Sequence, residues 1–321
     1  MGQPKKKIII DTDPGIDDAM AIFVALRSPE LEVIGLTTIF GNVYTTLATR
    51  NALHLLEVAG RTDIPVAEGS HLTITKGTKL RIADFVHGTD GLGNQNFAPP
   101  KGKAIEQSAA TFLVQQASLY PGEVTVVALG PLTNIALALE LDPDFAKKVG
   151  QIVLLGGAFA VNGNVNPAAE ANIFGDPDAA DLVFTSGADI LAVGINITHQ
   201  VVLTDTDREK LSKSKGKLAQ YLCKILEVYF SYHHVAYNTA GVYLHDPTTL
   251  LAAVNPSLLT YAEGVVRVQT SGIMRGLTIF YNKKKRFGEV TEWSDKPNVK
   301  VAVTVDAPAV VELVMERLMN S

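Results

Sequence analysis

The sequence predicts an α/β fold with a mostly parallel central sheet that is covered by helices on both faces. Apolar runs typical of strands alternate along the chain with segments of helical periodicity. Strand-like runs such as Ile8–Ile10 are continuously apolar, which is typical of parallel strands buried on both sides. Because no linker, repeat or low-complexity tract interrupts residues 1–321, we expect a single domain.

The first half of the chain supplies most of the predicted sheet. Apolar and β-branched runs predict strands over 6–11, 32–40, 123–129 and 151–157. Apolar residues at helical spacing predict helices over 17–28, 45–60, 109–120 and 132–141. We expect the second of these helices to end at Gly60, because glycine readily adopts the left-handed conformation that closes a helix.

The second half is richer in helices, with a few additional strands near the C-terminus. Asp176 before Pro177 is typical of a helix start and predicts a helix over 177–187. Further helices are expected over 216–237, 245–254 and 307–319. Further strands are expected over 189–196 and near 262–270, 275–281 and 299–305.

The composition indicates a globular protein and excludes several classes of function. Hydrophobic residues make up 47% of the chain and charged residues 19%, which argues against a disordered protein. The net charge of −5 gives no reason to expect nucleic acid or an anionic membrane as a partner. We find no apolar span long enough to cross a membrane and no secretory signal. Because the single cysteine, Cys223, cannot form an internal disulfide, we expect a cytoplasmic protein.

Polar residues gather in the segments that directly follow the predicted strands. In such sheets ligands bind beyond the carboxyl ends of the strands, so these segments indicate where a functional site would lie. They contain Asp11, Asp13, Asp17 and Asp18, then Gly41 and Asn42, then 130–134, then Asn162, Asn164, Asn166, Glu170 and Asn172. A late helix start adds His245 and Asp246. We therefore expect carboxylates, amides and one histidine to meet at one edge of the sheet.

The acidic segment predicts a metal site. Its four aspartates lie between positions 11 and 18, with no lysine or arginine among them to offset their repulsion. A divalent cation would offset it, and Ca²⁺ binds carboxylate and backbone carbonyl oxygens. Alternatively, Asp17 and Asp18 suit the first turn of a helix, where they stabilise its N-terminus. Capping accounts for one or two of the four, and Asp246 offers a distal ligand, so we favour the metal.

The loop over 162–172 predicts a sugar-binding site. Asparagine suits turns, but one glutamate among several amides also matches the donors and acceptors of sugar hydroxyls. A phosphate-binding motif is not evident, because the chain has no G-x-x-x-x-G-K-[ST] sequence. The segment GLGNQN at 91–96 does not complete the G-x-G-x-x-G motif. A neutral, polyhydroxylated substrate therefore fits best.

These motifs together resemble the nucleoside hydrolases, the inosine-uridine type N-ribohydrolases. The resemblance begins with DTDPGIDDA at 11–19 and extends over nearly the whole chain. The other motifs are GN at 41–42, HGTDGLG at 87–93, LGPLTN at 129–134, GNVNPAAEANIFGDPDAA at 164–180 and HDP at 245–247. The resemblance implies a Rossmann-like fold and an enzyme that cleaves the N-glycosidic bond of ribonucleosides with water and one tightly held Ca²⁺.

The resemblance also implies a role for each matching residue. The metal ligands would be Asp13, Asp18, Asp246 and the backbone carbonyl of Leu129, and Asp13 would also take the proton of the attacking water. The ribose 2′ and 3′ hydroxyls would be held by Asp17, Asn42 and Asn172, and the 5′ hydroxyl by Asn164 and Glu170. Asp11 would help to orient the other carboxylates. His245 would face the nucleobase as an acid, with His87, His233 and Tyr237 near it.

The chemistry of these residue types agrees with that reaction. Departure of the base leaves an oxocarbenium-like sugar, so the reaction needs an activated water on one face and help for the leaving group on the other. A divalent cation lowers the pKa of bound water, and Asp13 can take its proton. Histidine has an ordinary pKa close to neutrality, so we expect His245 to donate to the leaving base.

The base pocket has more than one interpretation. His233 and Tyr237 are four residues apart and share one face of a helix, which fits a base contact and ordinary packing equally well. His233 and Ala171 depart from better-known family members, in which an aromatic residue often follows the glutamate. The chain is most similar to plant-type uridine, xanthosine and inosine ribohydrolases, and the resemblance implies a homodimer or homotetramer.

Two other functions compete with this interpretation. A haloacid-dehalogenase-type phosphatase also has Asp-x-Asp after a strand, and GDPDAAD at 175–181 resembles its late acidic motif. That family would have Thr or Val where Gly15 stands, and it would leave the loop over 162–172 without a role. A non-catalytic nucleoside or ribose binder on the same fold would need neither Asp13 nor His245.

Overall fold

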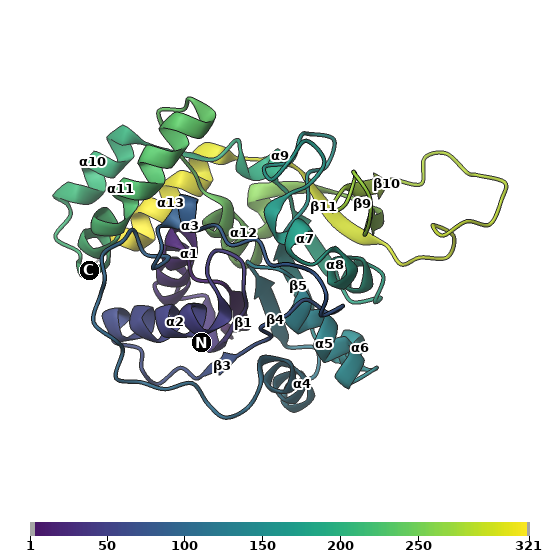
Figure 1. Ribbon diagram of the computed structural model, residues 1–321, viewed down its shortest axis with the longest axis horizontal. Helices are drawn as coiled ribbons and strands as arrows, with labels where there is room; N and C mark the ends of the chain where they lie inside the picture. The colour runs from purple at the N-terminus through teal and green to yellow at the C-terminus, as the bar shows by residue number, and fades with distance from the viewer. Residues whose placement is uncertain (1–3, 320–321) are drawn as a thin grey trace.

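The computed structural model describes residues 4–319, within which the main sheet has nine strands in the order β10-β9-β11-β6-β5-β4-β1-β2-β3 (Figure 1). The strands that pair in parallel are β1 (Lys6–Thr12), β2 (Leu31–Thr38), β3 (Val66–Glu68), β4 (Val124–Ala128), β5 (Gln151–Leu155), β6 (Ile190–Val193) and β11 (Val299–Val305). At one edge, β9 (Leu259–Val268) and β10 (Thr278–Tyr281) pair antiparallel. The predicted mostly parallel sheet with a few additional C-terminal strands is confirmed.

Helices cover both faces of this sheet, because successive side chains of a strand point to opposite sides. Ile8 and Ile10 belong to one core and Ile9 to the other, and all three are fully buried. The first core includes α1 (Ile16–Leu26), α2 (Thr45–Ala59), α11 (Lys217–Tyr237), α12 (His245–Val254) and α13 (Ala307–Met319). The second includes α4 (Ala109–Leu119), α5 (Thr133–Leu141), α6 (Phe145–Lys148) and α8 (Pro177–Phe184).

The two predicted helix boundary signals are confirmed. Gly60 closes α2 in the left-handed conformation, with φ of 70°. Asp176 begins α8, since its side chain accepts a hydrogen bond from the backbone N–H of Ala179 and Pro177 follows directly. Both signals are local, because the capping side chain or the left-handed glycine itself ends the helix. The sequence can therefore predict such helix ends.

Several short elements were not expected from the sequence. They are α3 (Asp84–His87), α7 (Ala171–Gly175), α9 (Ile195–Thr198), α10 (Asp205–Lys213), the 3₁₀ turn Pro256–Leu258, and the two-stranded sheet of β7 (Val202–Thr204) and β8 (Gly241–Tyr243). The predicted strand over 189–196 is too long, because β6 ends at Val193 and α9 begins at Ile195. Gly194 precedes α9, and an added Cβ there would lie 2.7 Å from the carbonyl oxygen of Gly157, so this close approach of two backbone segments requires glycine.

One peripheral loop stands apart from the rest of the structure. The segment over 282–298, between β10 and β11, extends away from the body of the molecule (Figure 1). Its basic residues, Lys283–Arg286, are exposed. Within residues 4–319, the structure has no helix that is both long and apolar enough to cross a membrane.

Candidate active site

The carboxyl ends of the central parallel strands converge on one cavity. Asp11 of β1 lies in register with Thr37 of β2 and with Ala128 of β4, so the polar segments after these strands start at the same level. The cavity encloses about 610 Å³ of space, part of it open to solvent. The predicted residues that line it are Asp17, Asn42, His87, Leu129, Asn164, Glu170, Asn172, His233, Tyr237, His245 and Asp246. The structure therefore brings them together, while their individual roles stay predictions.

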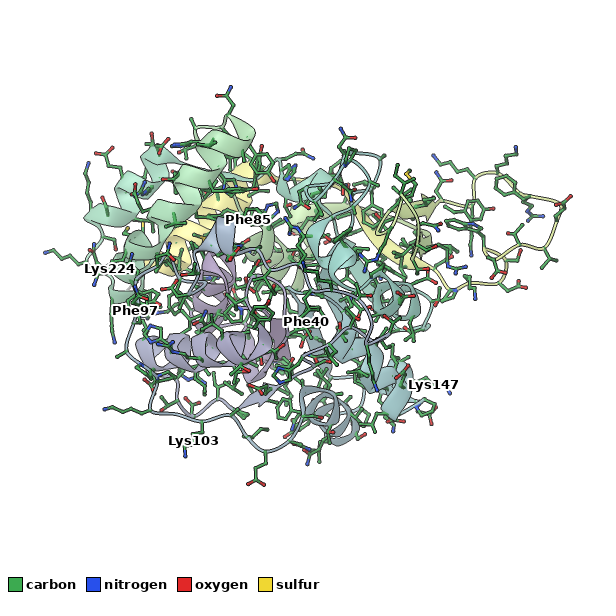
Figure 2. All side chains as sticks on the ribbon, viewed as in Figure 1. Phe40, Phe85, Phe97, Lys103, Lys147 and Lys224 are labelled. Atoms are coloured by element: carbon green, nitrogen blue, oxygen red, sulfur yellow. The ribbon has the colours of Figure 1, made fainter. Side chains whose placement is uncertain are left out.

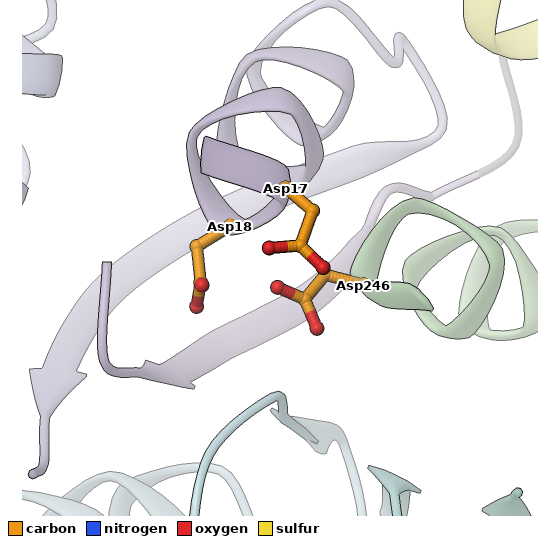
Figure 3. A group of neighbouring side chains, drawn as sticks. All are labelled: Asp17, Asp18 and Asp246. Carbon is orange, nitrogen blue, oxygen red and sulfur yellow. The ribbon is translucent and has the colours of Figure 1, made fainter. Parts of the chain in front are cut away.

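Three buried carboxylates meet at the floor of this cavity, of which Asp17 and Asp246 line it and Asp18 does not. Asp17 and Asp18 lie in the first turn of α1 and Asp246 lies at the start of α12, and their side chains point toward one another (Figure 3). One oxygen from each lies within 4.8 Å of the others. Burial, followed by repulsion from Asp18, raises the pKa of Asp17 to about 7. Burial and the charge of Asp17 likewise raise the pKa of Asp246.

Asp13 lies beside this cluster and has one carboxylate oxygen without a partner. Its Oδ2 accepts a hydrogen bond from the backbone N–H of Asn42 (2.6 Å), whereas Oδ1 is buried and has no hydrogen bond within the described chain. A Cβ at Gly130 would lie 2.7 Å from Oδ1, so only glycine lets this loop approach so closely. Burial and then the charge of Asp18 raise the pKa of Asp13, so an ionised Asp13 needs a positive partner.

Asp18 satisfies both interpretations of the acidic segment. Its Oδ2 accepts hydrogen bonds from the backbone N–H of Gly15 (3.0 Å) and from Asn42 Nδ2 (2.8 Å), and Thr12 donates to Oδ1 (2.5 Å). Asp18 therefore caps α1, as the helix-capping interpretation of the acidic segment predicted. Capping leaves Asp13 and Asp246 without a counter-charge, however, and their oxygens with the carbonyl of Leu129 are the hard donors that a divalent cation binds. The residues present thus fit a divalent cation.

Asp11 supports the acidic floor from within β1. Its Oδ1 accepts hydrogen bonds from Thr37 Oγ1 (2.5 Å) and Asn134 Nδ2 (2.8 Å). The side chain is fully buried, and burial raises its pKa to about 6. Like Asp13 and Asp18, Asp11 does not line the cavity, and its Oδ2 is buried without a partner in the described chain. Its hold by Thr37 and Asn134 is consistent with a supporting carboxylate.

Glu170 is held by the start of α7, which lies within the segment expected to be a loop. Its Oε1 accepts from the backbone N–H of Asn172 (2.9 Å), and its Oε2 accepts from those of Gly157 and Ile173 (both 3.1 Å). Burial raises the pKa of Glu170. The carboxylate is thus fixed in place by the backbone, with lone pairs left for a ligand hydroxyl.

Two asparagines complete this side of the cavity. Asn172 Nδ2 donates to the carbonyl oxygens of Leu129 (2.7 Å) and Leu155 (3.1 Å). Asn164 Oδ1 accepts from the backbone N–H of Ala171 (2.9 Å). Both amides are positioned before any ligand binds, which is the arrangement that favours recognition of a rigid polyol.

The opposite side of the cavity is formed by one face of α11. His233 packs between Tyr229 and Tyr237, with ring centroids 4.3 and 5.4 Å away. The Tyr229 hydroxyl also donates to Asp17 Oδ2 (3.1 Å), which joins this aromatic face to the acidic floor. The predicted sharing of a helix face by His233 and Tyr237 is confirmed, and the face serves both packing and the cavity wall.

Two histidines of this side are neutral, and their partners fix which nitrogen carries the proton. His87 Nδ1 accepts from the backbone N–H of Ile16 (3.0 Å), so its proton is on Nε2. His233 Nδ1 donates to the carbonyl of Tyr229 (2.9 Å), so its Nε2 is an acceptor, and that atom is buried without a partner in the described chain. Burial lowers the pKa of His87 to about 3 and that of His233 to about 4.

His245 departs from the expectation of an ordinary pKa. Burial, followed by the proximity of His199, lowers its pKa well below the usual range, so the ring is neutral at pH 7. Its Nδ1 lies 2.7 Å from Thr198 Oγ1. His199 itself stacks on Tyr243 with ring centroids 4.4 Å apart and lies 5.5 Å from His245. His245 can therefore orient a hydrogen bond, but it does not hold an extra proton in this environment.

Some cavity residues were missed by sequence reasoning. They are Arg81, Ala83, Val86, Leu155, Tyr229 and Tyr232 in the lining, with Thr198 and His199 behind His245. Tyr229 could have been found, because it lies four residues before His233 and so shares its helix face, and Tyr232 lies three residues after Tyr229. Arg81 gave no such signal, because it lies in a segment without periodicity.

Comparison with known proteins agrees with this geometry. The family model of the inosine-uridine preferring nucleoside hydrolases matches residues 8–312. The chain is 78% identical over 317 residues to a probable uridine nucleosidase 2 of Arabidopsis thaliana, which spans 99% of this chain and 98% of that protein. Uridine nucleosidase 1 of the same plant is 54% identical and spans 98% of this chain and 94% of that protein.

Solved structures lead to the same family. A plant nucleoside hydrolase, the PpNRh1 enzyme, superposes with a TM-score of 0.97 at 61% identity, covering 99% of this chain and all of the other. A purine-preferring ribonucleoside hydrolase from Gardnerella vaginalis gives 0.90 at 36% identity, covering 98% of each chain. The phosphatase and the non-catalytic binder are therefore set aside. The chain belongs to the inosine-uridine preferring nucleoside hydrolase family and is a ribonucleoside hydrolase.

Proposed function

We propose that this enzyme hydrolyses uridine, with inosine and xanthosine as further substrates, and that it does so with bound Ca²⁺. The observation that carries the proposal is the buried, unpartnered Oδ1 of Asp13 beside the carboxylates of Asp18 and Asp246. A buried anion without a counter-charge is costly, so the site favours a hard cation. When bound, the cation supplies Lewis acidity that makes water a better nucleophile.

The acidic floor would then position and deprotonate the nucleophile. Asp13, Asp18, Asp246 and the carbonyl of Leu129 are proposed as the ligands. Asp13 would accept the proton of the attacking water, since its Oδ1 has no other hydrogen-bond donor. Support comes from the backbone N–H of Asn42, which fixes the other oxygen of the same carboxylate.

The ribose would lie between this floor and the start of α7. Asp17, Asn42 and Asn172 are proposed to hold the 2′ and 3′ hydroxyls, and Asn164 and Glu170 the 5′ hydroxyl. Contacts of this kind accelerate the reaction when they strengthen as the sugar ring flattens toward the oxocarbenium-like transition state. The hydrogen bonds that fix Glu170 and Asn172 support this role.

The nucleobase would lie against the aromatic face of α11. His245 and His87 are proposed to donate hydrogen bonds to the leaving base, and His233 and Tyr237 to contact it. Uridine is favoured because the relatives at 78% and 54% identity are named as uridine nucleosidases. In His233 the acceptor on Nε2 is complementary to the ring N–H that uracil and hypoxanthine present.

The setting of the enzyme is also a proposal. We infer that the chain works as one domain, because the main sheet combines strands from its first and last thirds. A cytoplasmic location is supported by the lone Cys223, and a homodimer or homotetramer by the family resemblance. Light scattering of the purified protein tests the oligomeric state.

The experiment that tests the function is a panel of uridine, inosine, xanthosine, adenosine and cytidine, scored for released ribose. We expect uridine to be cleaved fastest. Removal of metal with a chelator should abolish cleavage, and Ca²⁺ should restore it more effectively than Mg²⁺, because Ca²⁺ accepts irregular oxygen cages. Full activity after exhaustive chelation would overturn the metal, and cleavage of none of the five would overturn the substrate class.

A further inference from the structure

Arg81 introduces a positive charge into the cavity that the site described so far does not use. Among the cavity-lining residues in the part of the chain described, it is the only one with a permanent positive charge. A guanidinium carries five N–H donors and does not deprotonate in proteins. Arg81 is half-buried, yet within residues 4–319 it donates no hydrogen bond and forms no ion pair. Its donors are therefore available to a ligand.

The surrounding residues hold Arg81 toward the base side. Its guanidinium lies over the ring of Phe85, 5.1 Å from the centroid, and Phe85 is labelled in Figure 2. The Phe85 ring in turn packs edge-on against Tyr232 of α11, at 5.9 Å. The segment is tied down by the backbone N–H of Ala83, which donates to the carbonyl of Gly41 (3.2 Å). Arg81 therefore occupies a defined position beside the aromatic face.

Glu170 does not account for this arginine. The two charges interact through space, but both carboxylate oxygens of Glu170 already accept backbone N–H groups, and Arg81 donates to neither. Arg81 lines the same cavity as Tyr232 and Tyr237, which belong to the base side. Its unused donors thus border the place proposed for the nucleobase.

The reaction creates a negative charge at that place. The C1′–N bond breaks with its electron pair going to the nucleobase, and the oxygen of water forms the new bond to C1′. One proton of the water passes to Asp13 and later, through solvent, to the nucleobase, so that ribose and the neutral base result. Until that proton arrives, the leaving base is an anion. His233 cannot stabilise it, because its one N–H is already donated to Tyr229.

We propose that Arg81 is a catalytic residue that stabilises the anionic nucleobase as it leaves. The proposal rests on the proposed function, and it adds a residue that the family motifs did not indicate. A preformed donor aimed at a developing charge in a partly dehydrated cavity contributes to the transition state much more than to substrate binding. The effect of Arg81 should therefore depend on how poor the leaving group is.

The test compares Arg81→Gln with the parent enzyme on uridine and on p-nitrophenyl β-ribofuranoside, whose leaving phenolate needs little stabilisation. We expect kcat on uridine to fall about 100-fold and kcat on the activated riboside less than about fivefold. Arg81→Lys should recover part of the loss, since lysine keeps the positive charge but lacks the planar array of N–H donors of a guanidinium. Guanidinium chloride at millimolar concentration should partly rescue Arg81→Ala on uridine.

The control is Lys79→Gln, which removes an exposed positive charge two residues away on the same loop. It should leave both rates within about twofold, because exposed charges contribute little. Equal losses on both substrates in Arg81→Gln, or a change confined to KM, would overturn the leaving-group role. If the parent enzyme cleaves the activated riboside but none of the nucleosides, the proposed function fails at that step, before the variants are compared.

Discussion

The sugar-and-metal end and the base end of the cavity are built in different ways. Asp11, Asp13, Asp17 and Asp18 come from one short stretch that crosses from β1 into α1, and the backbone holds them. The base end is assembled from α11, the α3 region, α9 and the start of α12, which are far apart in the sequence. The core of the first end is thus a continuous motif that Asp246, Leu129 and the start of α7 complete, whereas the second end is a tertiary arrangement of side chains throughout.

The two ends also differ in how their polar atoms are satisfied. At the acidic end several carboxylate oxygens accept hydrogen bonds, whereas in the described chain Asp13 Oδ1, where a cation is proposed, and Asp11 Oδ2 are buried without a partner. At the base end the ring nitrogens His233 Nε2 and His199 Nε2 are buried without a partner in the described chain, among stacked aromatic rings. A strict geometric demand at one end and an adaptable surface at the other would let one reaction accept several bases.

The largest expected effect tests the acidic end. Asp13→Asn keeps the shape of the side chain but cannot accept the proton of water and weakens the cation site. We expect kcat on uridine to fall at least about 1,000-fold, in line with loss of a general base together with metal binding. Released ribose measured at saturating Ca²⁺ checks the value, and circular dichroism checks that the fold is kept.

Asp11→Asn is the matched control for Asp13. The two side chains lie two residues apart, but Asp11 is held by Thr37 and Asn134, whereas Asp13 lies beside Asn42 and Asp18 at the proposed cation site. Loss of Asp11 should therefore cost only about tenfold in kcat. If both variants lost activity equally, the distinction between a reacting and a supporting carboxylate would be wrong.

The next effect concerns the pH dependence of Ca²⁺ binding. The pKa of Asp17 is raised to about 7 by burial, and those of Asp13 and Asp246 are raised as well. Between about pH 4 and pH 7 the folded, metal-free protein therefore holds protons that the unfolded chain has lost. These carboxyls stabilise the fold at low pH, and that contribution is lost as the pH rises through 7.

A cation must displace those protons, so its apparent affinity should rise as the pH rises. We expect Ca²⁺ to bind on the order of 100-fold more tightly at about pH 7 than at about pH 5. Calorimetric titration in buffers of different ionisation enthalpy measures both the affinity and the protons released. An affinity that does not change with pH would show that the raised carboxyls are not the ligands.

A smaller effect is expected at the base end. His233→Phe keeps the ring and its packing but removes the buried acceptor. We expect kcat/KM for uridine to fall about 10-fold, because the ring N–H of uracil loses its partner, while inhibition by free ribose is unchanged. The melting temperature should stay the same or rise, because a buried acceptor without a partner costs about 1–3 kcal/mol in the free enzyme.

His234→Phe is the control for this variant. His234 is the next residue on α11 but is largely exposed and faces Asp205 rather than the cavity. Its replacement should leave kcat/KM within about twofold, as is usual for exposed sites. A drop in ribose binding with His233→Phe would mean that the two ends of the cavity are not separable.

The contrast between the ends explains how much the sequence could predict. The apolar strands and the acidic motif are local patterns, so the sheet and the position of Asp13, Asp17 and Asp18 at its edge followed directly. The segment over 81–87, by contrast, reaches the cavity through tertiary contacts such as those of Ala83 with Gly41 and of His87 with Ile16. Likewise, the lowered pKa of His245 depends on its burial and then on nearby His199, and both come from tertiary packing. Sequence periodicity carries no information about such contacts.

The smallest expected effect tests whether Thr198 orients the ring of His245. Thr198→Val keeps the size of the side chain but removes the hydroxyl that lies 2.7 Å from His245 Nδ1. If Thr198 orients the ring, kcat on uridine should fall about fivefold, with no change in Ca²⁺ affinity, because one neutral hydrogen bond is worth about 1 kcal/mol. Thr198→Ser should restore the rate, since it returns the hydroxyl. A loss that Ser does not restore would assign the effect to packing of α9, and an unchanged rate with Val would mean that the aromatic cluster alone holds His245.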